Sequence, residues 1–83
     1  MRVVAELPHA VCKITIFSMN QKFIIKLEKG IYEQTYKVAE VDLTDGLNGV
    51  FKILDEEFMK TAAQRFETMR SDFHAAFSRY ETL

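Results

Sequence analysis

The chain has 83 residues, of which 48% are hydrophobic and 28% charged, and its formal net charge is −1. These values are typical of one small folded domain, residues 1–83, and exclude a disordered chain. The charge excludes a global field that attracts nucleic acid or an anionic membrane. Cys12 is the single cysteine, the first residues are too quickly charged for a signal peptide, and no apolar run could span a bilayer. We therefore expect a cytoplasmic protein.

Residues 1–40 show the two-residue alternation of β-strands. Apolar and polar side chains alternate over residues 11–19, 22–28 and 32–38, after a first extended run that a proline ends near residue 8. β-branched and aromatic residues are frequent in each of these runs. The pattern predicts a four-stranded antiparallel meander.

Two tight turns predict how the strands pair. We expect one turn to be centred on Asn20 and Gln21 and the next on Lys29 and Gly30. These turns predict the cross-strand pairs Lys13–Glu28, Ile16–Ile25, Phe17–Ile24, Lys26–Glu33 and Leu27–Tyr32. Both registers place apolar residues on a common face and opposite charges across from each other.

The second half of the chain has helical periodicity. Apolar residues share one side of the segment 43–54, which predicts a short helix with Thr44 or Asp42 as its N-cap. Asp55 and the two glutamates after it predict a new helix start, and the long helix is expected over residues 55–80. A single helix over residues 44–80 is the alternative, but the glycines of the first segment favour a break.

The expected fold is therefore α+β. A four-stranded antiparallel meander is followed by a short and a long amphipathic helix, and both helices pack on one sheet face. The residues expected on that face are Ile14, Ile16, Phe23, Ile25, Leu27, Tyr36 and Val38.

The long helix carries an apolar stripe that continues to its last turn. At 1.5 Å per residue it would be about 39 Å long, whereas a compact chain of this length is roughly 30 Å across. The helix should therefore extend beyond its own sheet, and a second copy of the chain is the simplest cover for the stripe. The expected homodimer interface consists of Met59, Phe66, Met69, Phe73, Phe77 and Tyr80. The sequence leaves open whether the paired helices run parallel or antiparallel.

No group of residues in the sequence predicts catalysis, a cofactor or a metal site. His9 and Cys12 have the spacing of half a zinc site, but two further ligands are missing. The segment 42–46 lacks the oxygen ligands of a calcium loop, and the scattered glycines form no phosphate-binding loop. We therefore expect a non-enzymatic interaction module that acts as a homodimer.

Two alternatives remain from the sequence. The first is a single-stranded nucleic-acid-binding protein, which would use the sheet face that carries Lys13, Phe17, Lys22, Lys26 and Lys37. Arg2 is expected on this face too, together with Glu6, Glu28 and Glu33. The second alternative is a small-ligand-binding protein or enzyme with a pocket between helix and sheet, near Tyr32, Gln34 and Tyr36.

The order of four strands and a long helix resembles the single repeat of PUR-type nucleic-acid-binding domains. This resemblance lies in the architecture alone, because the strands lack a matching basic and aromatic signature and a short helix precedes the long one. It implies pairing through the helices and a nucleic-acid-binding sheet face.

Overall fold

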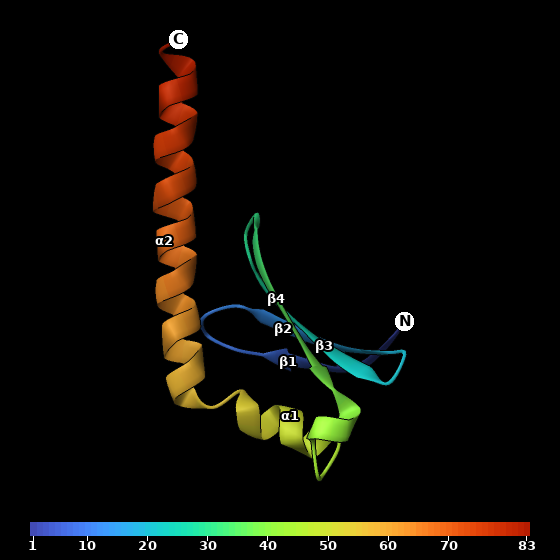
Figure 1. The fold of residues 1–83 in the computed structure, drawn as a ribbon. Coiled ribbons are helices and arrows are strands. Elements are labelled where there is room, and N and C mark those ends of the chain that lie inside the picture. Colours follow the sequence, from blue (N-terminus) through green and yellow to red (C-terminus); the bar gives the residue numbers. More distant parts are fainter.

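The computed structural model describes all 83 residues and consists of one sheet followed by helices (Figure 1). The elements are β1 (Arg2–Pro8), β2 (Lys13–Met19), β3 (Lys22–Lys29), β4 (Tyr32–Ala39), a 3₁₀ turn (Glu40–Asp42), α1 (Leu47–Ile53) and α2 (Glu56–Glu81). The strands form an antiparallel sheet in the order β1-β2-β3-β4. The α+β fold predicted from the sequence is confirmed.

The turn between β2 and β3 has the predicted position. Asn20 and Gln21 have φ angles of 51° and 64°, and positive values at both central residues are what a type I′ hairpin turn requires. Lys13 consequently pairs with Glu28, as predicted. The pairs Ile16–Ile25 and Phe17–Ile24 are confirmed as well.

The predicted register between β3 and β4 is wrong by two residues. Lys29 pairs with Tyr32, so the turn is centred on Gly30 and Ile31. Gly30 has a φ of +61°, and glycine at the first central position is characteristic of a type II′ turn. A shift of two residues leaves every side chain on its predicted face, which is why the core prediction survives.

A β-bulge in β1 changes the sheet face on which the first side chains of this strand lie. The register between β1 and β2 shifts between Val3 and Ala5, so Arg2 pairs with Ser18. Ser18 shares its face with Ile16, because alternate residues of a strand point to the same side. Arg2 is therefore on the face toward the helices, and its predicted place on the lysine face is wrong. No turn residue or proline in this segment marks the bulge.

The core lies between one sheet face and the helices. β2 and β3 contribute most of it, α1 contributes Val50, and the first three turns of α2 contribute Met59, Ala62 and Phe66. Partly buried residues, among them Tyr36 and Val38, surround this cluster. The residues expected on this face are therefore in the core or packed against it.

The two helices are separate, as the sequence predicts. Asp55 is the N-cap of α2, and its Oδ1 accepts a hydrogen bond of 2.8 Å from the backbone N–H of Phe58. The predicted cap of the first helix is wrong, because α1 begins only at Leu47 and its N-cap is Gly46 with a φ of 56°. Thr44 and Asp42 precede the helix and do not cap it.

The molecule is elongated because α2 projects from it. The principal extents are 51 × 26 × 20 Å, and the radius of gyration is 15.2 Å. Figure 1 shows the C-terminal half of α2, coloured orange to red, passing the tip of the β3–β4 hairpin and continuing alone. The sheet therefore covers only the N-terminal half of the helix.

Candidate self-association surface

The projecting part of α2, residues 70–81, is called the overhang below. Its apolar side carries three aromatic rings with large exposed fractions, 55% for Phe73, 51% for Phe77 and 68% for Tyr80. The ring of Phe73 meets the ring of Tyr32 edge to face, with 6.5 Å between the centroids. Beyond this contact the sheet offers the helix no cover, and the apolar stripe continues into solvent.

A shallow hollow lies where the overhang leaves the sheet. It has a volume of about 430 Å³ and is lined by Tyr32 of β4 and by Met69, Asp72, Phe73 and Ala76 of α2. Four of these five side chains are hydrophobic. The hollow therefore continues the apolar stripe of the overhang toward the sheet.

The six residues predicted for the dimer interface fall into three groups by their exposure. Met59 and Phe66 are only 3% and 2% exposed, since the chain's own sheet covers them. Met69 is half-buried at the boundary of the core. Phe73, Phe77 and Tyr80 form the exposed group, and only these three rings and Met69 remain at the surface for a second copy.

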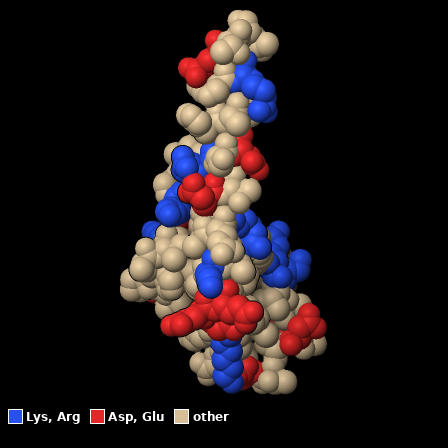
Figure 2. All heavy atoms as spheres, turned by 90° about the vertical axis from the view of Figure 1, so that its left-hand side faces the viewer, with Lys and Arg blue, Asp and Glu red and all other residues tan.

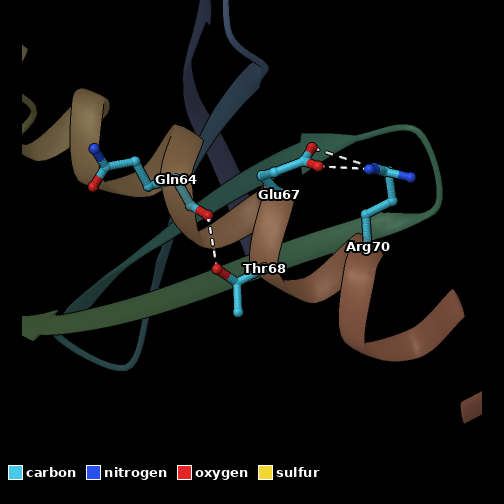
Figure 3. A network of polar contacts seen from close by, with 4 residues as sticks. All are labelled: Gln64, Glu67, Thr68 and Arg70. Atoms are coloured by element: carbon cyan, nitrogen blue, oxygen red, sulfur yellow. Dashed lines mark hydrogen bonds and ion pairs between the residues drawn. The ribbon is translucent and has the colours of Figure 1, made fainter. Parts of the chain in front are cut away.

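Charged residues flank the overhang, and one pair of them is already engaged. Figure 3 shows Glu67 and Arg70 joined side by side on α2, with Nη2 of Arg70 2.5 Å from Oε1 of Glu67. The hydrogen bonds and charge of each partner lower the pKa of Glu67 and raise the pKa of Arg70. Asp72 and Arg79, in contrast, form no ion pair within the chain.

The outer surface of the helix changes character along its length. Viewed from the side of α2, the acidic residues gather at the lower end, where the first turn carries Glu56 and Glu57 (Figure 2). The upper, projecting part carries positive and negative groups scattered among uncharged surface. The acidic first turn stabilises the positive end of the helix dipole.

The polar groups near the third candidate site are engaged in contacts between helix and sheet. The side chain of Gln34 donates to the carbonyl oxygen of Ala62 over 3.0 Å and accepts from the hydroxyl of Tyr36 over 2.6 Å. Arg65 donates to both Gln34 and Tyr36, at 3.2 and 2.8 Å. Gln34 and Tyr36 are therefore held by α2 and do not point into an open pocket, while Tyr32 packs on Phe73.

The lysine face of the sheet is on the side away from the helices. Lys13, Lys22 and Lys37 are exposed, whereas the half-buried Lys26 lies 3.4 Å from Glu33. Phe17 is half-buried and Ile24 is 8% exposed, so neighbouring side chains cover much of their surface. With Arg2 on the other face, four lysines share this surface with the glutamates at 6, 28 and 33.

The residues weighed as zinc ligands do not converge. Cys12 is 7% exposed, and burial raises the pKa of its thiol. Nδ1 of His9 accepts a hydrogen bond of 3.0 Å from the backbone of Val11. Nowhere in the chain do three or more His, Cys, Asp or Glu side chains gather as metal ligands would.

Comparison with protein-family models, curated proteins and solved structures finds no match to this chain. Neither helix has the combination of length and apolarity that crossing a bilayer requires.

Three residues of this surface were missing from the sequence prediction. Tyr32 belongs to it through the fold, which brings β4 beside the overhang. Asp72 and Arg79 had a signal in the sequence, because they are seven residues apart and border the apolar stripe on the same side.

Proposed function

We propose that this protein is a small, non-enzymatic, cytoplasmic interaction module that acts as a homodimer through the α2 overhang. One observation carries this proposal: the apolar stripe continues through Phe73, Phe77 and Tyr80 after the sheet that covers its first half has ended. A contiguous exposed apolar surface of this kind is typical of a protein interaction site.

The free energy available from this surface is sufficient for a weak dimer. Full burial of a large apolar side chain contributes about 1.5–3 kcal/mol, and these rings are roughly half exposed. Six such rings, three from each copy, would contribute about 5–9 kcal/mol, against an association cost of ~4–15 kcal/mol. At the most favourable ends of these two ranges about 5 kcal/mol remains, which corresponds to a dissociation constant of about 0.2 mM, so we expect a weak dimer.

A second copy of the chain is the favoured partner, because it carries the same exposed apolar stripe and the stripe has the same length. Two-fold dimers are the commonest assemblies of soluble proteins, and they join one patch to itself. A purely apolar stripe is self-complementary in its chemistry, whereas a different protein would need a matching surface of its own.

Sedimentation velocity over a concentration series tests the proposal. The wild-type chain should pass from monomer to dimer between about 20 μM and 2 mM, a range centred on the dissociation constant given above. Tyr80→Asp and Phe77→Asp should remain monomeric, because each places a charge in the contact. Both side chains lie beyond the sheet, so circular dichroism should show unchanged folding.

Ser78→Asp is the matched control, since it adds the same charge on the outer side of the same helical turn. This variant should dimerise as the wild-type chain does. A wild-type chain that stays monomeric throughout the series would contradict the proposed function.

A further inference from the structure

We infer that the two copies pair with their overhangs antiparallel, so that Asp72 of each copy meets Arg79 of the other. This inference rests on the proposed homodimer and specifies its geometry. It is drawn from the phase of the apolar stripe, the position of the sheet and the two unpaired charges.

The position of the sheet excludes a parallel pair. The sheet packs on the apolar side of α2 over its first turns. The stripe of the overhang faces the same side, because Phe73 still contacts Tyr32 of β4. In a parallel pair, the N-terminal half of the second helix would therefore occupy the space of the first copy's sheet. In an antiparallel pair the two sheets lie at opposite ends, and each overhang meets the other overhang and the neighbouring Met69.

The stripe also sets a register for the antiparallel pair. Its spacing of three and four residues is that of the a and d positions of a heptad, with Phe73 and Tyr80 at a and Met69 and Ala76 at d. Antiparallel helices place a positions beside d positions. Phe73 then meets Ala76 of the second copy, and Tyr80 meets Met69 of the second copy.

This register combines large and small side chains and uses the hollow beside Tyr32. Each Phe73 ring packs against the small Ala76 of the other copy, which allows the helices to approach closely. Tyr80 of the second copy arrives at the level of Met69, which is part of the lining of the 430 Å³ hollow. The hollow would thus receive the most exposed ring of the partner.

The flanking charges complement each other in this register. Asp72 and Arg79 both border the stripe on one side, at g positions, and antiparallel pairing brings g positions of the two helices together. Two symmetric ion pairs form, Asp72 with Arg79 of the second copy and the reverse. Both residues are exposed and without an ion pair in the single chain, so each is free for this contact.

Charge exchange provides the first test, with dimer affinity measured by sedimentation. Asp72→Arg and Arg79→Asp should each weaken the dimer by about fivefold to tenfold, because each places two like-charge pairs in the interface. The double variant should recover the wild-type affinity. A mixture of the two single variants should form heterodimers in preference to either homodimer, since both of its pairs are attractive.

Ser71→Arg is the control for added charge, because its side chain points away from the stripe, and its dimer affinity should equal that of the wild type. If Asp72→Arg and Arg79→Asp also leave the affinity unchanged, or if the double variant is weaker than either single one, the inferred pairing is wrong.

Distance measurement provides the second test and reads the orientation directly. A spin label on Glu57→Cys, in a Cys12→Ala background, marks the exposed first turn of each α2. The antiparallel register separates the two labels by about 50 Å along the helix axes, whereas a parallel pair would leave them under about 30 Å apart. Double electron–electron resonance distinguishes these distances.

The outcomes separate this inference from the proposed function. A long distance with restored affinity of the double variant supports the antiparallel pair. A dimer in sedimentation with a short label distance overturns the orientation and leaves self-association standing. A chain that is monomeric at all concentrations overturns both.

Discussion

Gln34 joins the sheet to the long helix through hydrogen bonds that an apolar residue could not make. It is 6% exposed, and its amide contacts the carbonyl oxygen of Ala62, the hydroxyl of Tyr36 and the guanidinium of Arg65. Buried polar groups are tolerated only when they are paired, and no buried side-chain nitrogen or oxygen lacks a partner in this structure. The network thus fixes the position of α2 on β4.

The first prediction concerns this network. Gln34→Ala should lower the free energy of unfolding by about 1–3 kcal/mol, because Tyr36 and Arg65 lose their shared acceptor in a partly buried place. Urea unfolding followed by circular dichroism measures the change. Gln64→Ala is the matched control: this glutamine is exposed and its side chain forms no hydrogen bond, so the change should stay below about 0.5 kcal/mol. Equal effects of the two substitutions would contradict a structural role of the network.

At the scale of elements, α1 shows why its start was difficult to predict. Gly46 replaces a capping side chain, and Asp45 instead reaches Lys52 in the last turn, with 2.6 Å between Oδ2 and Nζ. Gly49 lies close to Leu43 and Asp45, and a Cβ at this position would come within 3.2 Å of Cδ2 of Leu43. The two glycines that indicated a weak helix therefore have specific structural roles. Gly46 adopts a positive φ angle, and Gly49 allows Leu43 and Asp45 to approach the backbone closely.

The second prediction concerns the pair of Asp45 and Lys52. The hydrogen bond and charge of Lys52 lower the pKa of the Asp45 carboxyl below its ordinary value. Because the folded-state pKa is the lower one, the stabilisation is fully present above the unfolded-state pKa and is lost as the pH falls through the folded-state pKa.

Lys52→Met should raise the pKa of Asp45 toward its ordinary value, and an NMR titration of the side-chain carboxyl measures it. Lys60→Met, which removes an exposed lysine without a carboxylate partner, should leave that pKa unchanged. An equal pKa in the wild type and in Lys52→Met would show that the pair does not form.

The sequence predicted the elements better than their exact pairing. Alternation and helical period depend on neighbouring residues, so the strands, the break at Asp55 and the core face followed directly. The register of the β3–β4 hairpin depends on the φ angle of Gly30 and on whether Gly30 is the first or the second central residue of the turn. The sequence allows both Lys29–Gly30 and Gly30–Ile31 as the central pair, because both contain the glycine. The bulge near Val3 depends on pairing with β2 and left no mark in the sequence.

At the scale of the whole molecule, the same stripe serves two purposes along one helix. Its first half closes the core of a small domain, and its second half extends beyond that core. The length of the helix relative to the sheet predicted the overhang, and the elongated shape confirms it. The sequence could not show which stripe residues lie over the sheet, because that depends on where β4 crosses α2.

The last prediction concerns the lysine face and nucleic acid. Affinity for single strands comes largely from lysine and arginine contacts to phosphates, and it decreases steeply with salt. Here Lys26 is paired with Glu33, and glutamates at 6, 28 and 33 share the face with the lysines. We therefore expect no saturable micromolar binding of mixed-sequence single-stranded DNA or RNA at low salt, measured by fluorescence anisotropy.

A matched variant makes this absence of binding informative. Glu28→Gln combined with Glu33→Gln removes two negative charges from the lysine face and leaves its lysines in place. This variant should bind single strands more tightly than the wild type, because the phosphates then meet a face with a larger excess of positive charge. Micromolar wild-type binding that salt abolishes, and that Lys13→Glu or Lys37→Glu removes, would instead establish the sheet as a nucleic-acid-binding surface. In that case the glutamates would tune affinity, and the dimer would serve to present two such faces on one strand.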